Sequence, residues 1–187
     1  EISTRDWSSD VCSSDLAGNE VEFPAKPFAS IFRNAKSNGL KLTIHAGEWA
    51  GPENIREAIE VLGADRIGHG VRVLENRHVV ALAVDHGTAF EVCPTSNFQT
   101  GAIEELHAHP VTQMMAEGLN ITINTDDPSI SQITLSDEYR LICEDLGLPL
   151  TVLLGRILAA AQATFLPEME RARLIASIRN QLASING

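Results

Sequence analysis

Three apolar segments of this 187-residue sequence each lead into side chains that can bind a metal ion or move a proton. These side chains are His45 with Glu48, His69, and the adjacent pair Asp126 and Asp127. Imidazole and carboxylate groups are common zinc ligands and general acid–base groups. Strands that repeatedly end in such residues are typical of a parallel β/α barrel, because all of its strand ends open onto one face. The pattern therefore predicts an active site at the ends of several strands.

The apolar spacing predicts the elements that must position these side chains. We expect strands at 40–45, around Ile67, at 88–93 and at 120–124, at intervals of about 25 to 30 residues that approach the unit length of a TIM (β/α)8-type barrel. Helices are expected at 27–36, from Pro52 to Gly63, from Val79 to Gly87, from Pro110 to Gly118, around Tyr139, at 151–165 and after Pro167. We therefore predict an α/β fold with about four β/α units, the truncated C-terminal half of such a barrel, followed by C-terminal helices.

Composition limits the class of protein. The chain is 44% hydrophobic and 21% charged, which is typical of a globular domain with a sizeable core. Its formal net charge of -11 disfavours nucleic acid and anionic membranes as partners. No apolar stretch approaches the roughly 20 residues of a membrane span, and the N-terminus lacks the order of a signal peptide. These features predict a cytoplasmic protein, in which Cys12, Cys93 and Cys143 are reduced and mostly buried thiols.

The first sixteen residues differ from the rest of the sequence. Residues 5–16 read Arg-Asp-Trp-Ser-Ser-Asp-Val-Cys-Ser-Ser-Asp-Leu, with no helical or strand period. They look like a translated sequencing adapter, so we interpret residues 1–16 as a non-native scar or a disordered tail. Residues 17–187 are then predicted to be the C-terminal part of the barrel domain.

Each candidate residue also has a purely structural interpretation. A histidine at a strand end is often only a hydrogen-bonded core or surface residue. The Asp126–Asp127 pair is consistent with a metal site, and equally with a solvated turn in which an aspartate caps a helix opened by Pro128. His107 and His109 form a His-x-His pattern, but no strand precedes them, so we do not expect them to bind metal. Other candidates expected to be structural are His78, His86 and Cys93.

Taken together, two imidazoles and three carboxylates at successive strand ends favour zinc. Zinc binds His nitrogen and Asp oxygen, and a catalytic zinc site keeps one position open for water, whose pKa it lowers toward about 7. The sequence has no dinucleotide-binding GxGxxG after a strand, no P-loop and no GxSxG elbow. It also lacks the HxE and PCxxC pattern of the small zinc deaminases. A metal-dependent hydrolase is the chemistry that remains.

The set of motifs resembles the adenosine deaminase family, in that family's order and spacing. The motifs are Leu-Ala-Gly-Asn-Glu at 16–20, His-Ala-Gly-Glu at 45–48, Arg-Ile-Gly-His-Gly at 66–70, Cys-Pro-Thr-Ser-Asn at 93–97 and Asn-Thr-Asp-Asp-Pro at 124–128. The resemblance extends from Leu16 to the C-terminus. It implies a zinc aminohydrolase that converts adenosine to inosine and ammonia.

The resemblance also implies a role for each matching residue. His45 and Asp126 would bind zinc, and His69 would orient or deprotonate the water that the zinc activates. Glu48 would protonate the purine ring nitrogen beside the amino-bearing carbon, for which it must itself be protonated. Two more residues would contact substrate: Asp127 on one side of the base and the Gly18 backbone at the purine edge.

One part of the family's pattern is missing. Family members begin with a strand ending in His-x-His that supplies two further ligands to the single zinc ion, and no such strand precedes Ala17. We therefore expect this chain to be inactive alone. The expected partner is a small-molecule purine nucleoside, and the oligomeric state is open. Two alternatives also remain open: a deaminase of adenine or of an N6-substituted adenine nucleotide, which Gly68 weakly disfavours, and a non-catalytic fragment or binding remnant.

Overall fold

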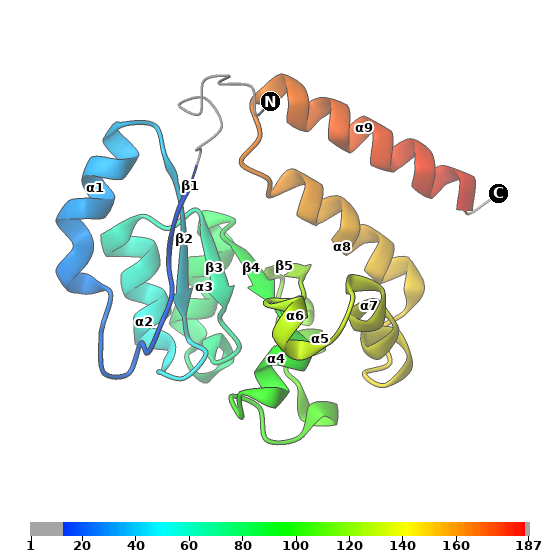
Figure 1. Ribbon diagram of the computed structural model, residues 1–187, viewed down its shortest axis with the longest axis horizontal. Helices are drawn as coiled ribbons and strands as arrows, with labels where there is room; N and C mark the ends of the chain where they lie inside the picture. Colours follow the sequence, from blue (N-terminus) through cyan, green and yellow to red (C-terminus); the bar gives the residue numbers. More distant parts are fainter. Residues whose placement is uncertain (1–12, 186–187) are drawn as a thin grey trace.

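A computed structural model describes residues 13–185 of the chain, and its centre is a sheet of five parallel strands in the order β1-β2-β3-β4-β5 (Figure 1). The strands are β1 (Ser13–Leu16), β2 (Lys41–Ala46), β3 (Arg66–His69), β4 (Ala89–Val92) and β5 (Asn120–Ile123). Sequential parallel neighbours joined by helical crossovers are the arrangement of a β/α barrel wall. The predicted α/β fold is confirmed, and the described residues supply an arc of such a barrel.

Helices connect and extend the sheet. The α-helices are α1 (Ala29–Ser37), α2 (Pro52–Glu57), α3 (Arg77–His86), α4 (Pro94–Gln99), α5 (Val111–Ala116), α6 (Pro128–Ser131), α7 (Leu135–Glu144), α8 (Leu150–Gln162) and α9 (Glu168–Ile185). Shorter helical turns are η2 (Lys26–Phe28), η3 (Ala58–Leu62), η4 (Val73–Glu75) and η5 (Leu106–Ala108). Helix α8 packs against β5 and against α9 (Figure 1). None of the described helices is long and apolar enough to span a membrane.

The strand register separates an apolar row from a polar row. Ile44, Ile67, Phe90 and Ile121 are aligned across β2 to β5, and all four are fully buried. Each such side chain stabilises the fold by about 1.5–3 kcal/mol when it is fully removed from water. Because successive residues of a strand face opposite sides, the next register row faces the other side of the sheet. That row is His45, Gly68, Glu91 and Thr122, so the alternation itself delivers polar groups to the interior of the arc.

Strand β1 is the main difference from the sequence-based expectation. Ser13–Leu16 pairs in parallel with β2, with Leu16 opposite Ile44, although these residues show no strand period. Four residues are too few to determine a strand by themselves. Here the hydrogen bonds to the neighbouring strand β2 determine the conformation. The sheet therefore has five strands where about four were predicted. Residues 1–12, with Cys12, lie outside the described residues, and the interpretation of residues 1–16 as a scar stays a prediction.

The predicted helices and strands agree with the structure to within a few residues, whereas α4 was not predicted. The helix expected from Pro52 to Gly63 begins as α2 and ends in the π-helical turn η3, where Gly63 adopts a left-handed conformation with φ 71°. The structure confirms that α5 packs its apolar side into the core, because Val111 and Met114 are fully buried. Cys93 is buried as expected, whereas Cys143 is only partly buried.

Candidate active site

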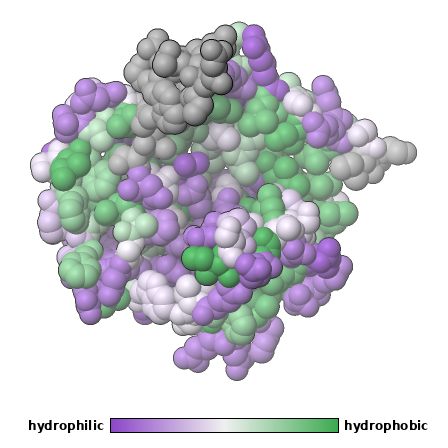
Figure 2. Space-filling model, viewed as in Figure 1, coloured by the Kyte–Doolittle hydropathy of each residue, from purple (hydrophilic) through white to green (hydrophobic). Residues whose placement is uncertain are grey.

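The carboxyl ends of strands β2 to β5 share one cavity of about 340 Å³. His45 lies near the end of β2, His69 ends β3, and Asp126 follows β5. The cavity is lined by His45, Gly68, His69, Glu91, Cys93, Ile123, Asn124, Thr125, Asp126 and Leu135. Figure 2, in the same view as Figure 1, shows a recess near the middle of the molecule with a largely hydrophilic wall. The structure thus brings three of the predicted residues to one hollow.

Three side chains form a close group at this end of the sheet. Ligand-type atoms of His45, Glu48 and His69 all lie within 4.8 Å of one another. His69 Nε2 is 3.5 Å from Glu48 Oε2, and the two imidazole rings meet edge to face with centroids 4.9 Å apart. The His69 side chain is only 3% exposed and that of Glu48 12%. Among the described residues, Asp126 lines the same cavity but stands outside this close group.

Gly68 makes room for the His45 ring. A Cβ atom built on Gly68 would lie 2.5 Å from His45 Cδ2, well inside the range of real contacts. Because Gly68 is directly opposite His45 in the register of β2 and β3, any side chain there would displace the imidazole. The glycine before His69 therefore has a structural reason, which is independent of the choice between nucleoside and nucleotide substrates.

Two of the site residues have an uncommon backbone conformation. His69 has φ 61° and Asp126 has φ 58°, and among the described non-glycine residues only Gln132 also has a positive φ. Histidine and aspartate tolerate the left-handed region better than most residues, but the conformation is still costly. His69 is the last residue of β3 and Asp126 lies three residues after the end of β5, and both side chains line the cavity. Backbone outliers at such positions are typical of functional sites.

The buried carboxylate of Glu20 holds the loop that carries Glu48. Oε1 accepts hydrogen bonds from the backbone N–H groups of residues 48, 49 and 50, at 2.8, 2.6 and 3.0 Å. Oε2 accepts from the Gly47 N–H at 2.8 Å and from the Asn54 side chain at 3.2 Å. Hydrogen bonds from backbone amides to a carboxylate are among the stronger ones in proteins. Glu20 thus fixes the path of the chain immediately after β2.

Helix α4 supports two of the site residues from the end of β4. Ser96 Oγ donates to Asp126 Oδ2 at 2.6 Å, and Asn97 Nδ2 lies 3.0 Å from His69 Nδ1. The start of α4 is itself held from α7, because the Thr95 N–H donates to Glu138 Oε1 at 3.1 Å. Glu138 is fully buried, and its Oε2 has no hydrogen-bond partner. Desolvation by burial raises the pKa of this carboxyl group, so it stays protonated to higher pH than an ordinary glutamate.

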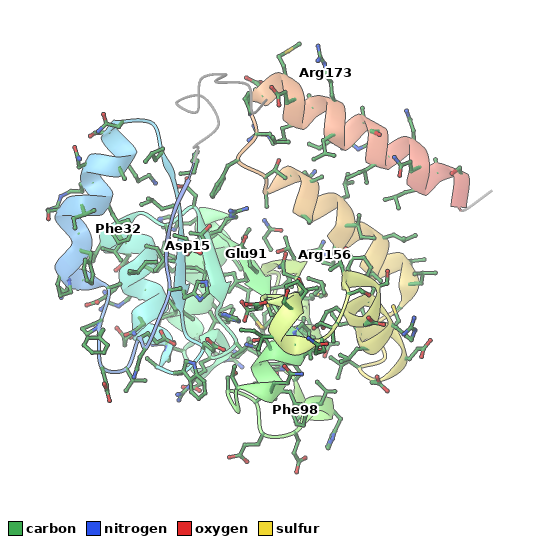
Figure 3. The ribbon with its side chains drawn as sticks, viewed as in Figure 1. Asp15, Phe32, Glu91, Phe98, Arg156 and Arg173 are labelled. Atoms are coloured by element: carbon green, nitrogen blue, oxygen red, sulfur yellow. The ribbon has the colours of Figure 1, made fainter. Side chains whose placement is uncertain are left out.

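Charged side chains also occur within strands β1, β3 and β4. Arg66 Nε is 3.2 Å from Glu91 Oε1 and 3.1 Å from Thr43 Oγ1, and its guanidinium stacks on the Phe165 ring at 3.7 Å. Asp15 Oδ2 on β1 is 3.7 Å from His45 Nε2. Figure 3 labels Asp15 and Glu91 at the sheet and Arg156 on α8. Burial raises the pKa of Glu91, and Arg66 opposes that shift.

Comparison with known proteins decides the family of this chain. The sequence model of the family described as adenosine deaminase matches residues 1–181. The adenosine deaminase of Serratia proteamaculans (strain 568) is 39% identical over 165 residues, which are 88% of this chain and 50% of that protein. This chain belongs to the adenosine deaminase family. It spans about half the length of the curated relatives that it matches.

Solved structures agree with this membership of the adenosine deaminase family. The adenine deaminase of Arthrobacter aurescens superimposes with a TM-score of 0.87 at 28% identity, covering 92% of this chain and 53% of that one. The N6-methyl-AMP deaminase of Arabidopsis thaliana superimposes with a TM-score of 0.81 at 26% identity, covering 90% of this chain and 49% of that one. The barrel arc is thus shared by relatives whose names state different purine substrates.

The donor set of the close group fits zinc. Two imidazoles and a carboxylate with mutual distances below 4.8 Å provide the nitrogen and oxygen ligands that zinc takes in catalytic sites. This group contains the predicted ligand His45, but its other members are Glu48 and His69, which were predicted to handle protons. The predicted ligand Asp126 is held at the rim by Ser96. The roles of these four residues toward a metal therefore stay predictions.

The electrostatics of the close group suit proton transfer in this family. Desolvation by burial, opposed in part by the hydrogen bond from Thr100, raises the pKa of Glu48. Burial, assisted by the neighbouring His45, lowers the pKa of His69 to about 4. A buried glutamate favours its neutral acid and a buried histidine its neutral base. At neutral pH the pair is therefore shifted toward a protonated carboxyl group beside an uncharged imidazole.

The remaining predicted residues lie at the edges of the site. Asp127 is exposed and is the N-cap of α6, where Oδ1 accepts from the Ser129 and Ile130 N–H groups at 3.1 and 3.2 Å. This is the capping interpretation offered for the aspartate pair. Gly18 lines a neighbouring cavity of about 220 Å³ that also contacts His45. The substrate contacts of Asp127 and Gly18 stay predictions.

Sequence reasoning missed the residues that support the site. It quoted Glu20, Ser96 and Asn97 within family motifs but gave them no role, and it treated His109 only as an unlikely metal ligand. The structure places His107 at the surface, 3.0 Å from Glu105, and buries His109 against Asn97. The sequence signal for the role of His109 is weak. A histidine that directly precedes a helix-opening proline gives no indication of which distant residue it contacts.

Proposed function

We propose that this chain is part of a zinc-dependent aminohydrolase that converts adenosine to inosine and ammonia. The observation that carries the proposal is the close group of His45, Glu48 and His69 at adjoining strand ends, in a chain that belongs to the adenosine deaminase family. Hydrolytic deamination needs groups that can donate and accept protons near neutral pH. In this group the pKa of Glu48 is raised and that of His69 is lowered.

His45 and Asp126 are the residues that we propose to hold the zinc ion, together with ligands that these described residues do not supply. A bound zinc ion would act as a Lewis acid that makes water acidic enough to attack at neutral pH. The donor types fit, and the two residues line the same cavity. Because Ser96 donates to Asp126 Oδ2, one carboxylate oxygen is held in place while the other remains available for the metal.

Glu48 is proposed to protonate a purine ring nitrogen. Its raised pKa keeps the carboxyl group protonated closer to neutral pH, which a general acid requires. The loop held by Glu20 limits how far this carboxyl group can move. His69 lies against Glu48, is uncharged at neutral pH and faces the same cavity. It therefore orients the attacking water or accepts a proton from it.

We propose that the 187-residue chain alone does not turn over adenosine. It covers 50% of the length of the Serratia relative. Strands β1 and β5 each have only one neighbour in the described sheet, so both flanks of the cavity lack a wall there. Two zinc ligands and an incomplete cavity would leave the metal largely hydrated and the substrate exposed to water.

A complementation assay tests the proposal. The chain is incubated with adenosine and zinc, alone and together with the part of the Serratia relative that this chain does not cover, and ammonia release is measured. We expect ammonia only in the combined sample, and loss of it when Glu48→Gln replaces the native chain. Turnover by the chain alone at an ordinary enzyme rate would contradict the inactivity proposal. A folded combined sample without deamination would favour a non-catalytic fragment.

The substrate is tested in the same assay. Adenosine is preferred because the 39% identical relative is an adenosine deaminase. Adenine and N6-methyl-AMP are the competing substrates, because the structural neighbours are deaminases of these molecules. We expect the largest kcat/KM with adenosine. A larger value with adenine or N6-methyl-AMP would transfer the proposal to that alternative without changing the reaction class.

Measurements of zinc affinity distinguish the proposed ligand Asp126 from its neighbour Asp127. We expect Asp126→Asn to weaken zinc binding by the combined protein tenfold or more, since second-shell changes alone cost about 10- to 100-fold in metal affinity. Asp127→Asn should leave zinc affinity unchanged because Asp127 caps α6. Calorimetric titration measures both. Equal effects of the two substitutions would show that the assignment of Asp126 as the ligand is wrong.

A further inference from the structure

His109 has a hydrogen-bond partner at each ring nitrogen. The residue precedes α5, is 4% exposed and forms no part of the cavity. The backbone N–H of Val111 donates to His109 Nδ1 at 3.2 Å. That nitrogen must therefore carry a lone pair, so in the neutral ring the proton is on Nε2. Burial lowers the pKa of His109 to about 4, which keeps the ring neutral at physiological pH.

The position of that proton fixes the orientation of the Asn97 amide. His109 Nε2 lies 3.3 Å from Asn97 Oδ1, so the protonated nitrogen faces the carbonyl oxygen. The opposite amide orientation would place the Asn97 NH2 group against the His109 N–H, two donors facing each other. Asn97 is fully buried, so no solvent can relieve such a clash. The amide oxygen is thus directed to His109 and the NH2 group to the other side.

The orientation of Asn97 in turn determines the tautomer of His69. Asn97 Nδ2 lies 3.0 Å from His69 Nδ1, and an NH2 group can only donate. His69 Nδ1 must then be the acceptor, and the single ring proton of neutral His69 is on Nε2. This N–H lies 3.5 Å from Glu48 Oε2, at the cavity. A backbone amide at the start of α5 therefore sets the proton position of a histidine near the end of β3.

We propose that His109 is a positioning residue that, through Asn97, holds His69 as the tautomer protonated on Nε2. Every hydrogen bond in the series runs in one direction, from the Val111 N–H to the His69 ring. Protonation of His69 on Nδ1 would place an N–H against the Asn97 NH2 group, and turning Asn97 would break its contact with His109. The series therefore keeps the ring proton of neutral His69 on Nε2.

The consequence for the reaction rests on the proposed function, whereas the tautomer does not. With Nε2 protonated, His69 presents a donor to the cavity. It can orient an attacking water oxygen, but it has no lone pair on that nitrogen with which to remove a proton. Of the two roles considered for His69, orientation is the one that this hydrogen-bond series supports, and the proton of the water must go elsewhere.

¹⁵N NMR spectra of the 187-residue chain test the tautomer directly, without substrate or metal. A ring nitrogen with a lone pair and a protonated one resonate far apart. For the His69 ring we expect Nδ1 at the position of an unprotonated nitrogen and Nε2 at that of a protonated one. A His69 ring protonated on Nδ1, or averaged between the two tautomers, in the unmodified chain would overturn the proposal.

Two substitutions of His109 test whether it acts through hydrogen bonding. His109→Gln keeps an N–H donor at the place of Nε2 and an acceptor within the same side chain, so the His69 signals should remain separated. His109→Leu removes the donor, so the signals should shift toward each other as the tautomers mix. His107→Leu, at an exposed position two residues away, is the matched control and should change nothing. Unchanged His69 signals in His109→Leu would refute the role of His109.

Asn97→Asp should reverse the tautomer. A carboxylate accepts from both neighbours, so it still pairs with His109 Nε2–H but now requires a proton on His69 Nδ1. We expect the Nδ1 signal of His69 to move to the protonated position. If His69 Nδ1 remains unprotonated in this variant, the series does not control the tautomer. These spectra are independent of deamination, so their outcome is separate from success or failure of the complementation assay.

Discussion

Two carboxylates in this protein do the same job in different ways. Glu20 accepts hydrogen bonds from four consecutive backbone N–H groups in the loop after β2, twenty-seven to thirty positions along the chain. Asp127 accepts from two N–H groups that follow it directly, at the start of α6 after β5. Glu20 is buried and Asp127 is exposed. The loop at the β2 end is therefore held by a residue that is distant in the sequence. At the β5 end, the start of α6 is held by the residue directly before it.

The difference explains why the two strand ends have different electrostatics. At the β2 end, Glu48 is enclosed beside His45 and His69, and burial shifts the pKa values of Glu48 and His69. At the β5 end, both aspartates are exposed in the described structure. A loop that is held remotely can be buried without unsatisfied amides, because the distant carboxylate satisfies them. Remote anchoring is thus what makes a desolvated acid possible at this position.

The largest predicted effect comes from removing the remote anchor. Glu20→Ala leaves four backbone N–H groups without their acceptor, while the Asn54 amide keeps only the backbone carbonyl of residue 20. Each unsatisfied buried donor costs about 1–3 kcal/mol, and partial hydration of the loop will recover part of this. We expect the free energy of unfolding, measured by urea denaturation, to fall by about 3–5 kcal/mol. Glu22→Ala, at an exposed neighbouring position, is the control.

Amide hydrogen exchange then locates the effect of Glu20→Ala. The N–H groups of residues 47–50 should exchange faster, while those of Ser129 and Ile130 at the β5 end should not change. Acceleration at both ends, or a loss of stability below about 1 kcal/mol, would contradict the distinction between remote and local anchoring.

Gly68→Ala should have the next largest effect, and it acts where β3 meets the His45 ring near the end of β2. The new Cβ would lie 2.5 Å from His45 Cδ2, so the imidazole must move. Overpacking of this kind costs about 1–3 kcal/mol in the free energy of unfolding. Gly155→Ala is the matched control, because its Cβ would meet nothing within 4 Å and the position is exposed on α8. That control should be neutral or stabilising by up to about 1 kcal/mol in thermal or urea unfolding.

Acidification should destabilise the fold through its buried histidines. The pKa of His109 is about 4 in the folded protein against 6.5 as the ordinary value. The unfolded chain therefore binds the proton first, so this stabilisation is complete above about pH 6.5 and is lost as the pH falls toward 4. Between about pH 7.5 and 5.5 one such histidine removes about 1.4 kcal/mol from the free energy of unfolding.

The matched variant for the acid effect is His109→Gln, which cannot titrate. Its stability should fall by about 1 kcal/mol less than that of the native chain over the same pH interval. Raised pKa values at Glu48, Glu91 and Glu138 act in the opposite direction in both proteins and cancel in the comparison. Identical pH profiles for the two proteins would show that His109 is not kept neutral by burial.

The smallest effects are expected at the β5 end. Asp127→Ala removes a local helix cap and should lower the free energy of unfolding by about 1 kcal/mol. Asp127→Asn keeps a side-chain oxygen acceptor for the Ser129 and Ile130 N–H groups and should change it by only a few tenths of a kcal/mol, roughly. Urea denaturation of the two variants measures the difference. A loss in Asp127→Asn as large as that in Glu20→Ala would remove the contrast between the two ends.

The same contrast explains what the sequence could predict. Strands β2 to β5 and most of the longer helices were predicted because apolar periodicity and Pro or Gly boundaries are local signals, whereas α4 was not predicted. The gathering of His45, His69 and Asp126 followed from parallel strands ending on one face. The cap at Asp127 was also predicted as an alternative, because it depends only on the next three residues.

The unpredicted features all depend on distant partners. Ser13–Leu16 has no strand period, and its assignment as β1 comes from the neighbouring β2. Glu20 lies twenty-seven positions before the first N–H group that donates to it, and His109 reaches His69 only through Asn97. The close group also contains Glu48 rather than Asp126. Side-chain geometry of this kind is fixed by packing, which residue types and spacing do not specify.

The left-handed backbone at His69 and Asp126 has a consequence for how this protein would evolve without its substrate. A non-glycine residue in that region costs roughly 1–2 kcal/mol, and glycine does not incur this cost. If variants were selected only for the amount of folded protein, and not for catalysis, glycine or asparagine should therefore be tolerated at position 126. Such tolerance would identify Asp126 as a residue that folding alone does not require, which is expected of the proposed metal ligand.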